Sequence, residues 1–340
     1  MVNSEVYDVT IVGGGPAGLY SAFYSGLREM KTKLIEYNPF LGGKLNVYLE
    51  KVIWDIGGLP PTKGSQVITQ LENQAKTFDP TIVLGEKIVS IQKENNIFEL
   101  IAENGNVHLS KTIIIAVGSG ILKPTKLAIT DSQKYESTNL YYKVENLEQF
   151  RDKRVAISGG SNSAIDWANT LEPIASEVTL VYRGKALRGH EAEITKLLNS
   201  SIKCYFNNTI DQILPTNDLT RIKTLILKDH ELELATELDI DALVVNHGYD
   251  RENVLIEKPI SGIEIVDNHY FKTGSGCDTN IAGIYAAGDI SLHDGKINLI
   301  SGALHDGLVA VNAAKTYIDP KAESYGMVSS HHDALQARSK

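Results

Sequence analysis

Two glycine-rich turns hold the residues of this sequence with the clearest chemical use. The first reads IVGGGPAGL over 11–19, and the second reads SGGSNSA over 158–164. A turn of this kind presents backbone N–H groups at a helix N-terminus, where they can bind the pyrophosphate of a dinucleotide. Two such turns in one chain predict two dinucleotide sites.

The first turn lies between segments that give it a specific meaning. The apolar run 6–12 predicts a buried strand, and Pro16 and Ala17 begin a helical pattern. The segment TKLIE over 32–36 predicts the next strand. Strand, glycine turn, helix and strand in this order form the dinucleotide-binding unit of a doubly wound sheet. A glycine turn that binds no ligand is the alternative.

Each residue of the first motif has a separate task. Gly13 makes the tight turn, Gly15 lets the backbone approach the pyrophosphate, and Gly18 permits close packing of helix on strand. Glu36 ends the following strand, where its carboxylate can accept hydrogen bonds from both hydroxyls of a ribose. The turn by itself does not distinguish FAD from NAD.

A carboxylate near the C-terminus follows another buried strand. The segment NIAGIYAAGDI over 280–290 ends in Gly288 and Asp289, and the later half of 297–318 has helical periodicity. An earlier apolar run in 111–124 ends at Gly118. Asp289 is therefore either the N-cap of the last helix or a carboxylate presented to a ligand.

The second turn is also placed between a strand and a helix, in KRVAISGGSNSAIDWA over 153–168. Serine stands where the third glycine of the triplet is usual, and Ala164 takes the position that packs helix on strand. The candidate ligand contacts of this turn are Gly160, Ser161, Asn162 and Ser163.

The strand after the second turn indicates which dinucleotide binds there. Arg183 ends this strand and Arg188 follows, whereas an NAD site carries Asp or Glu at the strand end. Two guanidinium groups suit the 2′-phosphate of NADP(H), which they bind through charge-assisted hydrogen bonds. Gly184 departs from the second arginine that related NADPH enzymes often carry directly after the first. Two solvated surface arginines are the alternative.

Three motifs follow one another along the chain: the first glycine turn, Ala116-Val117-Gly118 and the segment that ends in Gly288-Asp289. Together they resemble the flavoproteins that bind two dinucleotides. In that family the first turn holds FAD and the late Asp binds its ribityl chain. The pattern also looks like the low-molecular-weight thioredoxin reductases, which carry a CxxC shortly before the second turn. Here 131–154 contains no cysteine, and the only cysteines are Cys204 and Cys277, far apart in the sequence. Disulfide exchange needs an attacking and a resolving thiol, so thioredoxin reduction is excluded.

The chain therefore resembles the ferredoxin/flavodoxin–NADP reductases of the thioredoxin-reductase-like type. The resemblance rests on 7–28, 41–60, 141–168, 283–289 and 311–320. It implies an α/β fold with two Rossmann-like dinucleotide-binding domains. The FAD domain is discontinuous, 1–119 and 247–340, and contains an inserted β-meander over 89–115 with a hairpin turn at 104–105. The NADP(H) domain is 120–246, and the tail 324–340 covers the flavin.

The resemblance also implies particular FAD contacts. Tyr48 stacks on one face of the isoalloxazine, and Lys44 stands where the family usually has Gln. Ile88 and Leu122 fall where the family contacts the adenine and flavin rings, although both residue types would equally be core residues. A packed surface tyrosine is the alternative for Tyr48.

The tail supplies the remaining FAD contacts by the same resemblance. Ser329 and His331 match the Ser or Thr and the aromatic ring that cover the opposite flavin face, with His332 as the rival ring. A disordered polar tail is the alternative. The complete implied FAD set is Gly13, Gly15, Pro16, Ala17, Gly18, Glu36, Gly43, Lys44, Tyr48, Ile88, Leu122, Asp289, Ser329 and His331.

The implied activity is hydride transfer between NADPH and FAD and single-electron transfer between FAD and ferredoxin or flavodoxin. No metal and no general acid or base is required, because the flavin carries the chemistry. The resemblance also implies a homodimer. Two alternatives stay open: an NAD(P)H-dependent diaphorase or quinone reductase, and a redox-sensing flavin-binding protein.

Composition narrows the setting. The net charge of −9 argues against nucleic acid as a partner, since phosphate neutralisation needs a basic face. The sequence has no apolar run long enough to span a membrane and no signal-peptide pattern at its start. The sequence therefore predicts a cytoplasmic protein without a membrane partner.

Overall fold

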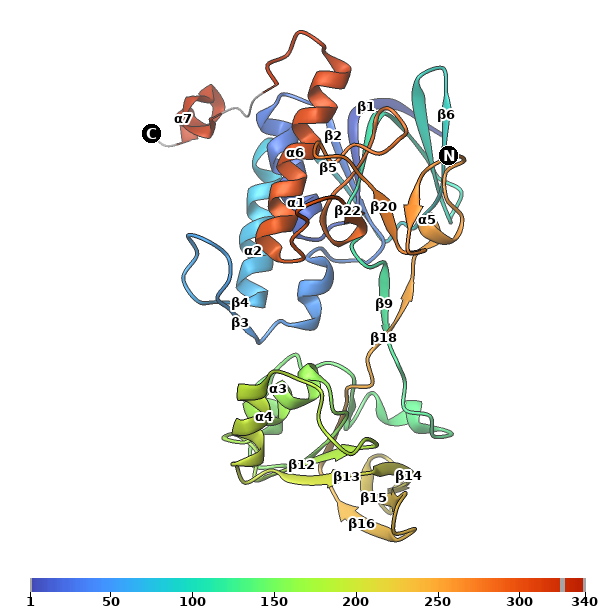
Figure 1. The fold of residues 1–340 in the computed structure, drawn as a ribbon, viewed down its shortest axis with the longest axis vertical. Helices are drawn as coiled ribbons and strands as arrows, with labels where there is room; N and C mark the ends of the chain where they lie inside the picture. The colour runs from blue at the N-terminus through green and yellow to red at the C-terminus, as the bar shows by residue number, and fades with distance from the viewer. Residues whose placement is uncertain (1, 325–327, 339–340) are drawn as a thin grey trace. The chain divides into compact units, whose positions relative to one another are not determined.

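The structure is a computed structural model of the 340-residue chain, and it describes residues 2–324 and 328–338. The chain forms two compact units (Figure 1). The first unit is Met1–Leu122 with Arg251–Lys340, and the inserted unit is Lys123–Asp250. The chain crosses between them in β9 (Ile121–Pro124) and β18 (Tyr249–Glu252), which pair with each other. Both crossings lie a few residues beyond the predicted 119 and 246.

A seven-stranded sheet forms the centre of the first unit, in the order β5-β2-β1-β8-β7-β6, with β21 paired to β8. Strands β5, β2, β1, β8 and β21 are parallel, and β7 and β6 continue the sheet as antiparallel strands. The bounds are β1 (Val2–Val12), β2 (Thr32–Glu36), β5 (Thr81–Leu84), β6 (Ile88–Glu94), β7 (Ile97–Ala102), β8 (Val107–Ile115) and β21 (Ile284–Ala286).

The predicted β-meander is present as β6, β7 and β8. Asn95 and Asn96, both at positive φ (47° and 64°), turn the chain between β6 and β7. Gly105 (φ 85°) turns it between β7 and β8, where the Asn-Gly signal predicted a hairpin. Because β8 is also the parallel neighbour of β1, the meander extends the dinucleotide-binding sheet and is not a separate insert.

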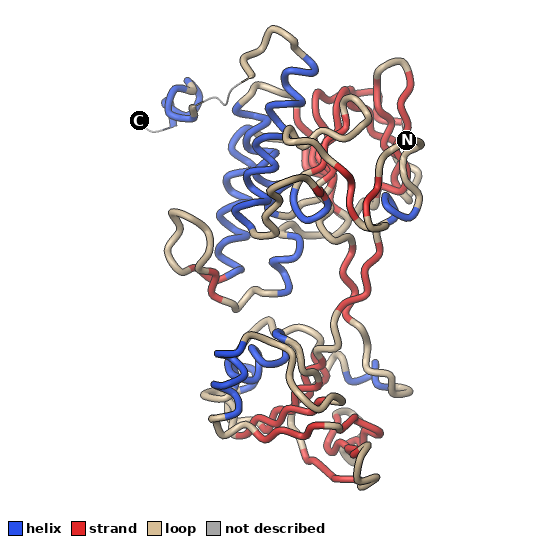
Figure 2. Tube along the Cα trace, viewed as in Figure 1, coloured by secondary structure: helices blue, strands red, loops and turns tan. Residues whose placement is uncertain are grey.

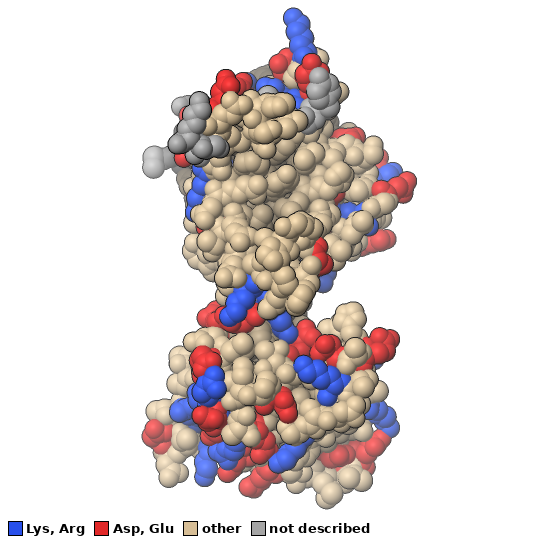
Figure 3. Space-filling view, turned by 90° about the vertical axis from the view of Figure 1, so that its left-hand side faces the viewer, with Lys and Arg blue, Asp and Glu red and all other residues tan. Residues whose placement is uncertain are grey.

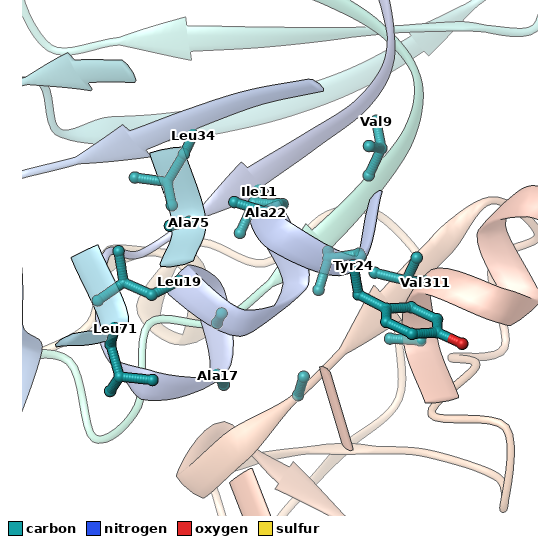
Figure 4. Close-up of a cluster of buried hydrophobic side chains, with 14 of the residues drawn as sticks. Val9, Ile11, Ala17, Leu19, Ala22, Tyr24, Leu34, Leu71, Ala75 and Val311 are labelled. Carbon is teal, nitrogen blue, oxygen red and sulfur yellow. The ribbon is translucent and has the colours of Figure 1, made fainter. Parts of the chain in front are cut away.

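Three helices cover one face of this sheet, as Figure 2 shows: α1 (Pro16–Leu27), α2 (Gly64–Ala75) and α6 (Ile300–Ile318). Their apolar sides pack against β1 and β2 in the core drawn in Figure 4. Ile11 and Leu34 of the strands are fully buried against Leu19 of α1. This packing fixes the start of α1 directly after β1, which is where the glycine turn lies.

The inserted unit repeats the parallel arrangement in the order β10-β17-β11-β12-β13. Its bounds are β10 (Leu140–Tyr141), β11 (Arg154–Ser158), α3 (Asn162–Leu171), β12 (Glu177–Tyr182), α4 (Glu191–Leu198), β13 (Lys203–Phe206) and β17 (Ala242–Val245). An antiparallel sheet of β14 (Asn208–Pro215), β15 (Ile222–Asp229) and β16 (Ala235–Asp239) is an element that the sequence patterns did not predict. The predicted α/β class with two Rossmann-type sheets is confirmed.

Short elements complete the chain: β3 (Val52–Ile53), β4 (Thr62–Lys63), α5 (Val254–Glu257), β19 (Ile265–Val266), β20 (Tyr270–Lys272), β22 (Ser291–Leu292) and α7 (Asp333–Arg338). Single 3₁₀ turns are η1 (Gly43–Val47), η2 (Lys76–Phe78), η3 (Ser132–Tyr135), η4 (Leu147–Phe150), η5 (Gly288–Ile290) and η6 (Ser329–His331). Among the described residues, no helix is both long and apolar enough to cross a membrane.

Candidate functional site

The first glycine turn is packed so tightly that side chains are excluded from two of its positions. A Cβ on Gly18 would lie 1.9 Å from the carbonyl oxygen of Gly13, and a Cβ on Gly13 would lie 2.4 Å from that of Ala116. Gly13 also has a φ of +112°, which L side chains rarely adopt. Gly15 is the N-cap of α1 and Pro16 is its first residue, so the N–H groups of this helix start face out of the turn.

Glu36 lies beside the first turn, at the end of β2. Its Oε2 accepts the N–H of Gly14 at 2.6 Å, and its Oε1 accepts both the N–H and the Nδ2 of Asn38 at 2.8 Å. The side chain is buried, at 6% exposure. A carboxylate has about four acceptor positions, so these three bonds leave about one for a ribose hydroxyl. That Glu36 binds both ribose hydroxyls stays a prediction, and a second hydroxyl would have to share an oxygen with Gly14 or Asn38.

The segment with Gly43, Lys44 and Tyr48 lies against the same turn. Gly42 donates its N–H to the carbonyl oxygen of Gly14 at 2.8 Å. A Cβ on Gly43, whose φ is +54°, would lie 2.8 Å from the Cα of Gly15. The backbones of the two glycine segments are thus in contact, and η1 presents an exposed Lys44 and a half-buried Tyr48 next to them.

Gly288 and Asp289 come to the start of α1 from the other end of the chain. A Cβ on Gly288 (φ +77°) would lie 3.1 Å from the Cβ of Ala17. Among the described residues, the Asp289 carboxylate has no hydrogen bond or ion pair, and it is partly exposed. The N-cap of α6 is Leu299, so the alternative that Asp289 caps this helix is excluded. The carboxylate stays available to a ligand.

The turn with Gly288 and Asp289 is held by a buried ion pair that the sequence patterns did not reveal. Lys296 donates from Nζ to the carbonyl oxygen of Gly288 at 2.7 Å and pairs with Asp306, and both side chains are at most 5% exposed. Asp306 in turn accepts the N–H of Gly288 at 3.0 Å. Both backbone groups of Gly288 are therefore fixed by one Lys–Asp pair. Nothing in the local sequence marks these two residues, because their partnership depends on α6 packing.

Ile88 and the tail occupy other parts of the first unit. Ile88 is buried in the core beneath the meander, at 5% exposure, and Leu122 ends the first unit in β9. Ser329 and His331 are exposed in η6, while His332 packs edge-on against Phe78 with ring centroids 5.0 Å apart.

The described part of the tail packs near the C-terminal end of α1. A Cβ on Gly26, in the last turn of α1, would lie 2.3 Å from the Cβ of Phe78. The tail thus lies at the C-terminal end of α1, about 18 Å of helix away from the glycine turn. Within one chain, Ser329 and His331 do not reach the first turn.

The second glycine turn lies at the carboxyl edge of the inserted unit's sheet. Gly159 has φ +148°, and a Cβ there would lie 2.5 Å from the carbonyl oxygen of Asn246. Ser161 is the N-cap of α3, in the place predicted for the second turn. Asn162 accepts the N–H of His190 at 2.9 Å through Oδ1, so this candidate ligand contact also has a structural partner.

Arg188 is fixed beside the second turn by its backbone. It donates its N–H to the carbonyl oxygen of Gly160 at 2.9 Å and forms an isolated parallel bridge with Ser161. Arg183 directly follows β12 at the same edge. Both arginines are exposed, and among the described residues neither guanidinium has a carboxylate partner. By contrast, the guanidinium groups of Arg151 and Arg154 are paired with acids.

The ring of Tyr182 explains two glycines of the second site. A Cβ on Gly160 would lie 2.4 Å from the ring, and a Cβ on Gly184 would lie 2.7 Å from it. A side chain at either position would force the Tyr182 ring to move. Gly160 was predicted as an NADP(H) contact, and in the structure its missing side chain also leaves room for the Tyr182 ring.

His247 joins this edge from β17, and the sequence patterns did not single it out. Its Nε2 is 2.8 Å from the Oγ of Ser158, the last residue of β11. Loss of hydration and the nearby Arg183 cation lower the pKa of His247 below the usual imidazole range. The signal available in the sequence was only its place after a buried strand of the same sheet.

Comparison with known proteins now defines the family. A profile of the pyridine nucleotide-disulphide oxidoreductase family matches residues 7–307. The chain belongs to this family. A protein named ferredoxin–NADP reductase 1 from Bacillus cytotoxicus is 52% identical over 341 residues, covering 100% of this chain and 98% of its own length. Its namesake from Oceanobacillus iheyensis is 53% identical over 338 residues, covering 99% and 97%. The resemblance inferred from the motifs is confirmed.

Solved structures agree on the fold. Thioredoxin reductase from Lactococcus lactis has a TM-score of 0.73 at 25% identity, covering 92% of this chain and 99% of its own. Thioredoxin reductase from T. acidophilum has a TM-score of 0.74 at 21% identity, covering 93% of this chain and 99% of its own. The shared architecture is therefore that of thioredoxin reductases.

This pyridine nucleotide-disulphide oxidoreductase has no pair of thiols for disulfide chemistry. The sequence contains two cysteines, and the structure places Cys204 in the inserted unit and Cys277 in the first unit, both free. Burial raises the pKa of Cys277 to about 12, so it is a thiol at neutral pH. Burial also raises the pKa of Cys204. A member of the family without a dithiol must transfer its electrons elsewhere.

Proposed function

We propose that this chain is a ferredoxin–NADP reductase that exchanges electrons between NADP(H) and ferredoxin or flavodoxin through FAD. The observation that carries the proposal is a family member with two dinucleotide turns and no dithiol. Two full-length relatives above 50% identity bear the same reductase name. A chain with this set of parts can accept hydride at one site but has no cysteine pair to reduce.

The residues of the first unit fit FAD. Backbone packing fixes Gly13 and Gly18, whereas a Cβ on Gly15 would come no nearer than 3.7 Å to a described atom. The turn therefore forms an open cradle at the N-terminus of α1, where a pyrophosphate is favoured. Glu36 keeps an acceptor for the ribose, and the unpaired Asp289 carboxylate can accept hydrogen bonds from ribityl hydroxyls. Gly43, Lys44 and Tyr48 lie beside the same cradle and would contact the flavin end.

The residues of the inserted unit fit NADP(H). Arg183 and Arg188 are two exposed cations at the edge where an NAD site would carry a carboxylate, and neither has an acidic partner within residues 2–324 and 328–338. Ser161, Asn162 and Ser163 lie at the start of α3, whose N-terminus favours an anion. We therefore propose that 123–250 binds NADP(H) and that the rest of the chain binds FAD.

The chain's own part in the reaction is binding and orientation. When both groups are bound, FAD supplies the chemistry by accepting hydride from NADPH and releasing electrons one at a time. Lys296 and Asp306 fix the turn that presents Asp289, and the contact of Gly43 with Gly15 fixes the segment that carries Tyr48. No side chain needs to act as a general acid or base.

We propose further that the chain forms a homodimer and works in the cytoplasm. The face over α2 and α6 carries few charged side chains (Figure 3), and the exposed residues of α2 include the uncharged set Gln66, Thr69, Gln70, Asn73 and Gln74. Depletion of charge is typical of a surface covered by a partner, so we propose that this face supports a homodimer. Two free cysteines agree with a cytoplasmic, reducing compartment.

Anaerobic stopped-flow spectroscopy of the FAD-loaded protein tests the function. We expect NADPH to bleach the flavin absorbance faster than NADH, and ferredoxin or flavodoxin to reoxidise it. Bleaching without reoxidation by either carrier would favour a diaphorase that reduces small acceptors. Absence of bleaching by both nucleotides would contradict the proposed function.

A further inference from the structure

The carboxyl edge of the inserted unit's sheet contains a titratable pair that the arginine-based prediction does not use. Ser158 ends β11 and His247 follows β17, its neighbour in the sheet. The Oγ of Ser158 and the Nε2 of His247 are 2.8 Å apart. Ser158 is buried, at 6% exposure, whereas His247 is exposed. The imidazole therefore contacts a buried hydroxyl and is itself accessible to solvent.

The backbone fixes this pair beside the second glycine turn. Asn246 donates its N–H to the carbonyl oxygen of Ser158 at 2.8 Å, and a Cβ on Gly159 would lie 2.5 Å from the carbonyl oxygen of Asn246. Little room for movement exists between the end of β11 and the end of β17. Ser158 directly precedes Gly159, so the pair lies next to the turn at which we propose that the dinucleotide binds.

We propose that His247 and Ser158 form a proton-linked phosphate-binding pair, in which His247 becomes an imidazolium when NADP(H) binds. The proposal rests on the NADP(H) site proposed for this unit. It adds to that site a residue whose charge depends on whether the ligand is present. The arginines, in contrast, are cations in both states.

The electrostatic reason lies in the neighbours of the ring. Among the described residues, Arg183, directly after β12, is the charged group that acts on His247, and Ser158 on β11 is its hydrogen-bond partner. Without ligand, the Arg183 cation and lost hydration favour the neutral imidazole. A bound phosphate brings negative charge to the same place and reverses this preference, so a proton is taken up from solvent.

The Ser158 hydrogen bond can change direction in step with the proton. A neutral imidazole with an unprotonated Nε2 accepts the Ser158 hydroxyl proton. An imidazolium donates from Nε2 to the Ser158 oxygen instead, and the hydroxyl proton is then free to be donated to a phosphate oxygen. Protonation of the imidazole thus frees one further donor toward the ligand, the Ser158 hydroxyl, and adds a positive charge beside it.

The sign of the pH dependence follows from this cycle. Because the bound state favours the protonated ring, binding is tighter at low pH and weakens as pH rises through the imidazole range near 6.5. A difference of one pKa unit between free and bound protein changes affinity about tenfold across that range. The 2′-phosphate itself also titrates near pH 6, so the effect of His247 is the difference between wild type and a variant.

The test measures NADP⁺ binding to the FAD-loaded full-length protein by calorimetry between pH 5.5 and 8, in buffers of different ionisation enthalpy. His247→Gln keeps a polar side chain without a titrating ring, and His230→Gln is the matched control on the same unit, because the His230 side chain is exposed and its Nε2 lies 3.0 Å from the Oγ1 of Thr209. Between pH 5.5 and 8, we expect the NADP⁺ affinity of wild type and of His230→Gln to fall about tenfold more than that of His247→Gln. Wild type and His230→Gln should also take up more protons on binding at pH 6.5. Equal slopes and equal uptake in wild type and His247→Gln would overturn the proposal.

A second readout does not depend on affinity. Imidazole resonances followed by NMR should show the His247 pKa rising when NADP⁺ is added, and an unchanged titration curve would overturn the proposal. Repeating calorimetry with NAD⁺ assigns the phosphate: a His247-dependent slope with both nucleotides indicates the pyrophosphate, and one with NADP⁺ alone indicates the 2′-phosphate. Equal affinities of the wild-type protein for NADP⁺ and NAD⁺ would instead contradict the proposed NADP(H) site itself.

Discussion

Replacing Arg183 and Arg188 by alanine should abolish the preference of this enzyme for NADPH over NADH. Both guanidinium groups are exposed and, within the described part of the chain, have no acidic partner. Their removal therefore breaks no ion pair of the free protein. The change should be confined to the complex with the nucleotide, where the 2′-phosphate loses its cationic partners.

The magnitude follows from the number and position of the lost bonds. A hydrogen bond to a charged group contributes about 1.5–3 kcal/mol, and about 1.4 kcal/mol corresponds to a factor of ten in affinity. Because both side chains are exposed, we take the lower end, which gives about tenfold for each arginine and about a hundredfold for the double variant. Arg188 should contribute the larger share, since its backbone is already fixed by the 2.9 Å bond to Gly160.

Steady-state reduction of the flavin by NADPH and by NADH measures this preference as a ratio of kcat/KM values. Arg151→Ala is a suitable control, because Arg151 is an exposed arginine of the same unit that pairs with Glu148. We expect the NADPH value to fall in the arginine variants while the NADH value stays the same. An unchanged ratio in the double variant would refute the assignment of the 2′-phosphate to these two residues.

Three further outcomes follow from named contacts. Gly18→Ala should destabilise the FAD-binding unit by several kcal/mol and release FAD, because its Cβ would lie 1.9 Å from a carbonyl oxygen, whereas Gly57→Ala, with open space around it, should leave the urea midpoint unchanged. Lys296→Met should weaken FAD binding, measured as free flavin fluorescence on dilution, by removing the buried donor that holds the acidic turn. Hydrogen bonds from Arg154 lower the pKa of Asp241, so this carboxylate stabilises the fold at neutral pH and the contribution is lost as pH falls through the folded-state pKa. Asp241→Asn should therefore lower the urea midpoint at pH 7 and lower it less at pH 3, and an equal change at both values would contradict this reasoning.

Local patterns predicted the elements that carry the turns. The strand TKLIE appears as β2 over the same residues, and α1 begins at Pro16, because a proline directly after a glycine turn can only begin a helix there. The antiparallel sheet β14–β16 was not predicted. Its strands alternate buried and exposed residues only in part, and its register contains bulges that blur the two-residue period.

Partnerships between distant residues were the part of the site that the sequence could not supply. Lys296 and Asp306 are ordinary surface residue types, and only the packing of α6 buries them together beneath Gly288. Ser158 and His247 meet because β11 and β17 are neighbours in the sheet although they are far apart in the chain. Local periodicity reports on a residue's own element, and it carries no information on which side chain faces it from another.

The unusual residues of the second site depend on one another. Gly184, where a second arginine was expected, and Gly160 both leave space that the Tyr182 ring occupies. An arginine at 184 would have to displace the ring or shift its backbone. The loss of that cation is offset by Arg188, which the bridge to Ser161 holds next to the glycine turn. We therefore expect Gly184→Arg to weaken NADPH binding instead of improving it, and tighter binding by this variant would show that Tyr182 does not constrain the site.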